Sequence, residues 1–198
     1  GALRPYHVLG VGGASVTLAG ATIRTPRRRT LDLGTGCGVQ ALLAARHSDA
    51  VVATDLSARA LEFARFNAAL AGVEGSRLEL RQGSMLDPVR PPEPGRFRRL
   101  LARGLPAPDA ELFDLVVSNP PFVITPRGAG VPEYTYRDGG RSGDDLVRDL
   151  VLGLPEVLAP GGVAQLLGNW EHRRGVDWRQ RVGEWVDRAG LDAWVVQR

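Results

Sequence analysis

Three glycines occupy every second position in the segment Gly34-Thr35-Gly36-Cys37-Gly38, which follows a short apolar run at residues 31–33. A helical pattern begins directly afterwards, at residues 39–45. Strand, glycine turn and helix in this order place the turn at the carboxyl end of a parallel strand, where open α/β sheets bind ligands. Glycine lets the backbone turn tightly and lie against a ligand, and the following helix presents free N–H groups to it.

Two carboxylates accompany this turn. Asp32 stands at the strand end, where a buried charge is costly unless it meets a partner such as a ligand ammonium group. Asp55 ends the next apolar run and lies 19 residues beyond Gly36, the usual distance for an acid that holds ribose hydroxyls. We therefore expect a nucleoside that carries an amino acid rather than a pyrophosphate. The alternative to a ligand site is a tight turn in which the buried Asp32 carboxylate is hydrogen-bonded within the protein.

The stretch from Asp32 to Gly38 closely resembles the cofactor loop of class I S-adenosylmethionine-dependent methyltransferases. This resemblance implies a doubly wound, mostly parallel Rossmann-like α/β sheet, and S-adenosyl-L-methionine as the cofactor. Ser84 and Met85 leave the third strand at the same edge of the sheet, where they would border the adenine, although Met85 is also explained by packing. The expected cofactor-binding residues are Asp32, Gly34, Thr35, Gly36, Gly38, Asp55, Leu56, Ser84, Met85 and Asn119.

A second motif, Asn119-Pro120-Pro121-Phe122, directly follows the fourth strand. In a doubly wound sheet this strand end lies beside the glycine turn. The side-chain oxygen of Asn119 and the carbonyl of Pro120 can each accept an N–H of a planar amino group, which directs the nitrogen lone pair at a methyl group. Phe122 offers a face for stacking. We therefore expect Asn119, Pro120 and Phe122 to be catalytic, and Pro121 and Phe122 to contact the substrate. A proline-rich Asx turn is the alternative.

The two motifs together resemble amino-methyltransferases that modify adenine, guanine or cytosine amines, or the glutamine amide of peptide release factors. The segment that contains Glu133 and Gly139-Gly140 resembles the release-factor enzymes, which implies that Glu133 contacts the substrate. Tyr134, Asp145 and Phe122 replace the proline, glycine and tyrosine usual in that family, and phenylalanine is commoner in the nucleic-acid enzymes. The acceptor, RNA or DNA on one side and a protein such as a release factor on the other, stays open. Gly12, Gly13 and Ser15 precede a short helix in a segment that resembles the cover over the methionine end, and a surface turn is equally consistent.

Strand and helix patterns alternate along all 198 residues, which predicts one domain over 1–198 with a parallel sheet. Six strands are expected, and the last strand of the methyltransferase sheet is missing, so we interpret the chain as a fragment of a longer protein. An excursion rich in proline and arginine, at about 88–111, interrupts the pattern and is expected to be mobile. The expected strands are 31–33, 50–54, 77–81, 113–118, 163–167 and 193–196.

Composition narrows the class of protein. No apolar run reaches the ~20 residues of a membrane span. The single cysteine, Cys37, excludes an internal disulfide, and three scattered histidines make a zinc site improbable, so no metal and a cytoplasmic location are expected. Every one of the 25 basic residues is arginine, but a net charge of +3 does not by itself indicate nucleic-acid binding.

Two rival functions stay open. A nicotinamide-dependent oxidoreductase on a dinucleotide fold requires a third glycine after a two-residue gap, where this chain has Val39. A non-catalytic nucleic-acid-binding module would keep the fold and use the arginines of residues 96–103. The sequence favours an enzyme, an S-adenosylmethionine-dependent N-methyltransferase that acts on a planar amino group.

Overall fold

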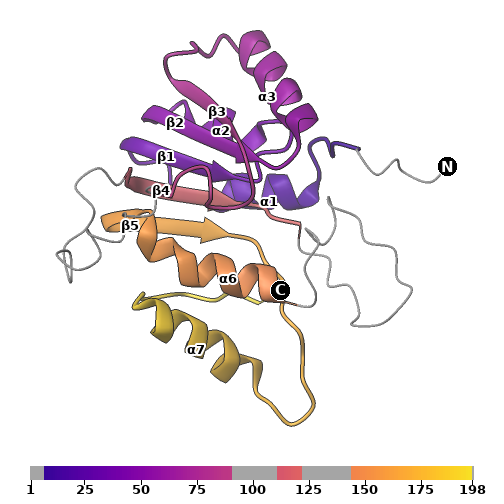
Figure 1. The fold of residues 1–198 in the computed structure, drawn as a ribbon, viewed down its shortest axis with the longest axis vertical. Coiled ribbons are helices and arrows are strands. Elements are labelled where there is room, and N and C mark those ends of the chain that lie inside the picture. The colour runs from indigo at the N-terminus through magenta and orange to yellow at the C-terminus, as the bar shows by residue number, and fades with distance from the viewer. Residues whose placement is uncertain (1–6, 91–110, 122–143, 198) are drawn as a thin grey trace, which may run out of the picture.

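The computed structural model describes residues 7–90, 111–121 and 144–197. Within them, five parallel strands form one sheet in the order β3-β2-β1-β4-β5 (Figure 1). The strands are β1 (Arg27–Leu33), β2 (Ser48–Asp55), β3 (Leu78–Gln82), β4 (Phe113–Ser118) and β5 (Leu158–Leu166). The helices are α1 (Gly13–Ala21), α2 (Val39–Ala44), α3 (Ala58–Leu70), α6 (Asp145–Gly153), the short 3-10 helix η1 (Leu154–Glu156) and α7 (Trp178–Ala189). The doubly wound α/β fold expected from the sequence is confirmed.

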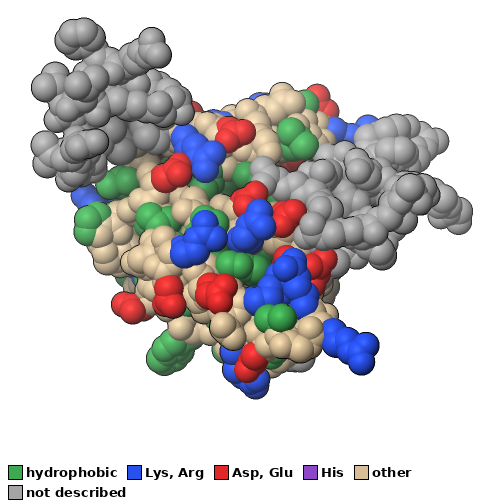
Figure 2. Space-filling view, turned by 60° about the horizontal axis from the view of Figure 1, so that its bottom comes forward, with side chains coloured by type: hydrophobic (Ala, Val, Ile, Leu, Met, Phe, Trp, Pro, Cys, Tyr) green, Lys and Arg blue, Asp and Glu red, His purple; other side chains and the backbone are tan. Residues whose placement is uncertain are grey.

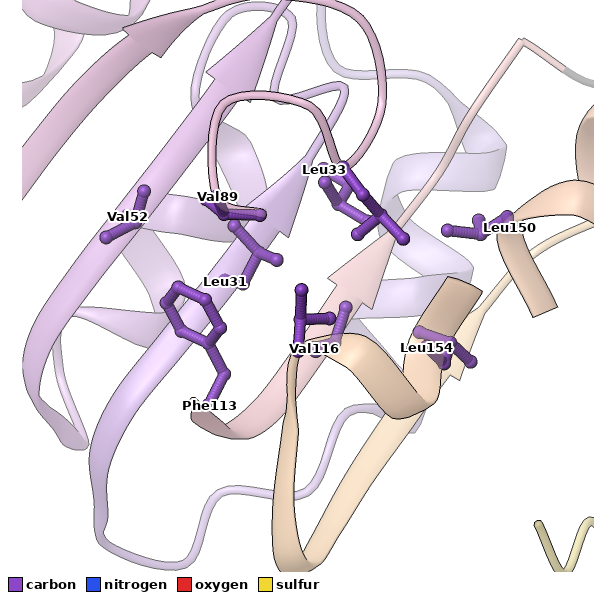
Figure 3. Close-up of a cluster of buried hydrophobic side chains, with 10 residues drawn as sticks. Leu31, Leu33, Val52, Val89, Phe113, Val116, Leu150 and Leu154 are labelled. Carbon is purple, nitrogen blue, oxygen red and sulfur yellow. The ribbon is translucent and has the colours of Figure 1, made fainter. Parts of the chain in front are cut away.

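Both faces of the sheet are covered, because strand residues alternate between them. Leu31 and Leu33 of β1 and Val116 of β4 pack with Leu150 of α6 and with Val89 in one core cluster (Figure 3). On the other face, β2 packs against α2 and α3 in a second cluster, which consists of Ala41, Ala44, Ala45, Val51, Ala53, Ala68 and Leu78. Asp32 alternates with Leu31 and Leu33 along β1, so it lies on the opposite face from them, under α2.

The register of the central strands positions the two sequence motifs. Leu33 of β1 pairs with Ser118 of β4, and the Ser118 hydroxyl donates a hydrogen bond of 2.9 Å to the Leu33 carbonyl. The glycine turn and Asn119 therefore begin side by side at the carboxyl end of the sheet.

The prediction of a sixth strand at 193–196 is wrong. These residues form no ladder with any described strand, and Trp194 is 99% exposed. No described strand occupies the outer edge of β5, but this segment runs along α7 rather than beside β5, so it forms no strand hydrogen bonds there (Figure 1). The fifth strand also begins earlier than expected, at Leu158, because the Pro160-Gly161-Gly162 turn forms an irregularity within β5 instead of preceding it.

The predicted start of the proline- and arginine-rich segment, at about residue 88, is also wrong. Val89 is 3% exposed and joins the central core, so residues 88–90 belong to the packed fold. Arg90 forms an ion pair with Glu156, and Arg81 binds both the Pro88 carbonyl and Glu111. The prediction of mobility for the rest of the excursion falls on residues 91–110, which lie outside the described residues.

The face made by α6 and α7 carries charges of both signs side by side (Figure 2). Asp144, at the start of α6, is buried and accepts hydrogen bonds from the Glu171 backbone N–H and from Arg181 of α7. Burial raises its pKa, but these donors outweigh burial and hold the pKa below its usual value. Within the described residues, no helix has the length and apolar character of a membrane span.

Candidate functional site

The loop between β1 and α2 takes a backbone course that glycine permits. Gly34, Gly36 and Gly38 all have positive φ, at 68°, 57° and 90°. A Cβ added at Gly34 or Gly36 would meet no atom within 4 Å, whereas one at Gly38 would lie 3.2 Å from Ala64. Gly38 therefore packs against α3, and Gly34 and Gly36 border open space at the carboxyl edge of β1.

Asp32 holds the loop from beneath. It is 1% exposed, and its Oδ2 accepts hydrogen bonds from the Thr35 hydroxyl at 2.6 Å and from the Ala41 N–H at 2.9 Å. The pKa of Asp32 is raised from 3.8 to about 6 as the net result of burial, which raises it most, the two hydrogen-bond donors, which lower it, and the charge of Asp55, which raises it. One N–H of the first turn of α2 is thus taken by Asp32 instead of facing a ligand. The expected contact of Asp32 with a ligand ammonium stays a prediction.

Asp55 holds the loop from its side. Its Oδ2 accepts the Gly36 N–H at 2.9 Å, and its Oδ1 accepts the Ser57 N–H at 2.8 Å. Burial raises the pKa of Asp55, and these two backbone donors offset part of that effect. Each oxygen keeps a further lone pair, so the carboxylate can still accept hydrogen bonds from ligand hydroxyls beside Gly36.

Asn119 supplies the open acceptor of the site. Its Oδ1 is buried from solvent and has no hydrogen-bond partner in the described part of the chain. Pro120 is buried, and Pro121 is half-buried. Because an unsatisfied buried acceptor is costly, Oδ1 is suited to receive an N–H from a bound molecule.

The remaining expected residues divide into three groups. Ser84 and Met85 line a small hollow against α6, and Met85, with φ of 46°, also packs on the central core. Leu56 is exposed, and its carbonyl accepts a hydrogen bond from Gln82. Phe122 and Glu133 lie outside the described residues, so their expected contacts stay predictions.

The segment before β1 is tied to the site by two glutamines that sequence reasoning missed. The Gln40 side chain donates to the Ser15 carbonyl at 2.8 Å, and Gln165 of β5 accepts from the Ile23 N–H and donates to the Ala21 carbonyl. Gly12 and Gly13 are exposed at the start of α1. No local pattern marks these glutamines, because their partners lie 25 to 144 residues away.

The groups around the glycine loop fit S-adenosylmethionine. The open space beside Gly34 and Gly36 admits a ligand against the backbone, the Asp55 carboxylate could accept hydrogen bonds from ribose hydroxyls, and Asn119 begins beside the glycine loop at the end of β4. Within the described residues, no group of three or more His, Cys, Asp or Glu side chains is placed to hold a metal ion.

Comparison with known proteins decides the family. Residues 25–125, which contain the glycine loop, Asp55 and Asn119, match the family model described as methyltransferase domain. The chain belongs to the methyltransferase domain family. S-adenosylmethionine is the cofactor of this methyltransferase domain, as expected from the sequence.

Curated relatives carry names of glutamine methyltransferases. The release factor glutamine methyltransferase of Deinococcus radiodurans is 36% identical over 151 residues, which make up 72% of this chain and 46% of that protein. The ribosomal protein uL3 glutamine methyltransferase of Bradyrhizobium diazoefficiens is 34% identical over 155 residues, or 73% of this chain and 42% of that protein. The methyltransferase domain thus spans about half the length of these relatives.

Among solved structures, the ribosomal protein L11 methylase of Lactobacillus delbrueckii subsp. bulgaricus has the same fold. Its TM-score is 0.52 at 20% identity, and the match covers 89% of this chain and 66% of that chain. The likeness supports the fold of the methyltransferase domain.

We predict that Asp32 makes the stability of the methyltransferase domain fall as pH rises. Because the pKa of Asp32 rises from 3.8 to about 6 on folding, the folded protein keeps a proton that the unfolded chain releases. The stabilising effect is therefore complete below about pH 4 and is lost as pH rises through about 6. Such a shift corresponds to about 3 kcal/mol.

Urea unfolding from about pH 4 to about pH 7 checks this prediction against Asp32→Asn, which keeps an acceptor but does not titrate. The free energy of unfolding of the wild type minus that of the variant should decrease by about 2–3 kcal/mol across this range. A difference that is constant with pH would contradict the raised pKa.

Proposed function

We propose that this methyltransferase domain transfers a methyl group to the side-chain amide nitrogen of a glutamine in a protein. The observation that carries the proposal is the buried Oδ1 of Asn119, which has no partner in the described residues and lies at the edge of the cofactor loop. A primary amide has two N–H groups and a planar, weakly nucleophilic nitrogen. A buried acceptor such as Asn119 Oδ1 can orient this amide nitrogen by accepting one of its N–H groups.

Asn119 would act by orientation. S-adenosylmethionine, when bound, supplies a methyl group on a positively charged sulfur. The Oδ1 of Asn119 and the carbonyl of Pro120 would each accept one N–H of the amide, so that the nitrogen lone pair points at the methyl carbon. Methyl transfer would form the C–N bond and break the bond between the methyl carbon and sulfur, and the alkylated nitrogen, now acidic, would release its proton to water, so no strong base would be required. The buried Ser118–Leu33 hydrogen bond keeps this corner in place beside the cofactor loop.

The names of the relatives support a protein acceptor over a nucleobase. Both relatives described above are named for glutamine methylation of a release factor or of a ribosomal protein. The choice between these two kinds of protein is left to experiment, as is the contribution of Phe122 and Glu133 to the acceptor site.

The acceptor is tested by incubating the protein with S-adenosylmethionine labelled in its methyl group, together with either a purified bacterial peptide release factor or total RNA. We expect the label in the release factor and its release as methylamine on acid hydrolysis, which is characteristic of a methylated amide. Label in the RNA alone would contradict the glutamine proposal and favour a base amine.

We predict that Asn119→Ala separates binding from catalysis. The variant should keep its cofactor affinity within about twofold and lose methyl transfer by a factor on the order of 10²–10³, as for other positioned hydrogen-bonding groups. Asn119→Asp, which keeps an acceptor, should lose less. Calorimetric titration with the cofactor and single-turnover methyl transfer measure the two effects. Full transfer activity in Asn119→Ala would mean that the corner is only a structural proline turn.

A further inference from the structure

Arginines gather at the amino edge of the sheet, opposite the cofactor loop. Arg27 begins β1, Arg46 and His47 directly precede β2, and Arg77 directly precedes β3. The Arg27 N–H donates to the His47 carbonyl at 2.8 Å, and the Arg77 guanidinium donates to the Ser48 carbonyl at 3.0 Å. Because neighbouring strands lie about 4.8 Å apart, this row spans about 10 Å across three strands.

Arg24 extends the row. Arg24 is exposed three residues before β1, and its guanidinium donates to the Ala19 carbonyl at 3.0 Å. Burial lowers the pKa of His47, and the positive charges of Arg24 and Arg27 lower it as well. We call Arg24, Arg27, Arg46, His47 and Arg77 the basic edge.

The arginines of the basic edge form no ion pairs among the described residues. None of the four has a carboxylate within 4 Å there, whereas the neighbouring Arg28 and Arg29 of β1 pair with Asp114 and Glu111. Arg27 Nε and His47 Nδ1 are also buried and have no hydrogen-bond partner among residues 7–90, 111–121 and 144–197. The α6 and α7 face is different, because there arginines alternate with the acids that pair with them (Figure 2). Clustered like charges repel one another, so a row of arginines without ion pairs suits an anionic partner.

We propose that the basic edge binds the phosphodiester backbone of a nucleic acid. The guanidinium fork matches phosphate oxygens in pairs, and a row on an open edge suits a polymer with repeated phosphates better than a single small anion. The glycine loop after β1 and Asn119 after β4 lie at the opposite, carboxyl edge of the same sheet, the edge with the arrowheads in Figure 1. A nucleic acid held at the basic edge therefore leaves the methyl-transfer site open.

Fluorescence anisotropy with 20-nucleotide oligouridylate and oligothymidylate, over a salt series, tests this site and separates RNA from DNA. The test variant combines Arg24→Gln, Arg46→Gln and Arg77→Gln. The control combines Arg65→Gln, Arg174→Gln and Arg188→Gln, which removes the same charge from three exposed arginines on α3, in the loop before α7 and on α7.

We expect the wild type and the control to bind with similar salt dependence. In the test variant, the slope of log affinity against log salt should fall by about 2, since each lost phosphate contact removes roughly 0.7. Its affinity at low salt should fall at least about tenfold, while its cofactor affinity stays unchanged. If the triple variant unfolds, Arg46→Gln replaces it as the test variant, because Arg46 is exposed. This single change should lower the slope by about 0.7.

Three outcomes would overturn the proposal: no binding by the wild type at low salt, equal weakening of the test and control variants, or equally tight binding of polyglutamate. Equal weakening would mean that net charge alone attracts the nucleic acid. Tight binding of polyglutamate would indicate an acidic protein as the partner. None of these measurements depends on which molecule receives the methyl group.

Discussion

The loop between β1 and α2 depends on two carboxylates that accept hydrogen bonds from the chain itself. Asp32 holds the loop to the first turn of α2, and Asp55 holds Gly36 from the neighbouring strand. Both are buried far enough that their pKa values rise, so the loop is ordered at an electrostatic cost. The positive φ values at Gly34 and Gly36 are compatible with this arrangement, and they leave open space beside the backbone. A ligand with hydroxyl donors can therefore meet a preformed surface with a carboxylate already in position.

The acceptor side of the site follows from strand order. Because β4 lies next to β1, and Ser118 pairs with Leu33, Asn119 begins at the edge where the cofactor loop begins. In the proposed reaction the two side chains would serve different parts: the Asp55 carboxylate would hold the cofactor, and the Asn119 Oδ1, which has no partner among the described residues, would orient the nitrogen that receives the methyl group. The basic edge lies at the opposite edge of the sheet, so the proposed nucleic-acid binding would leave the proposed methyl-transfer site open.

Local sequence patterns predicted the cofactor loop, both carboxylates and the position of Asn119, because each depends on residues close in the chain or on the rule that parallel strands end at one edge. Long-range features were not predictable. Gln165 holds α1 through partners far away in the sequence, and the grouping of Arg24, Arg46 and Arg77 appears only when three strands lie side by side. The segment 193–196 has residue types that favour a strand, but its contacts with α7, which the local sequence does not reveal, keep it away from β5. The proline-rich surroundings of Val89 predict a loop, although its apolar side chain belongs to the central core.

Calorimetric titration of S-adenosylmethionine into Asp55→Ala, with Asp49→Ala as the control, tests the central claim most directly. Both acids lie on β2, but Asp49 is exposed near its amino end, whereas Asp55 borders Gly36. The account predicts that Asp55→Ala weakens binding by about 1.5–3 kcal/mol, the scale of hydrogen bonds to a charged group, and that Asp49→Ala leaves affinity unchanged. Unchanged affinity in Asp55→Ala would contradict the assignment of this loop as the S-adenosylmethionine site.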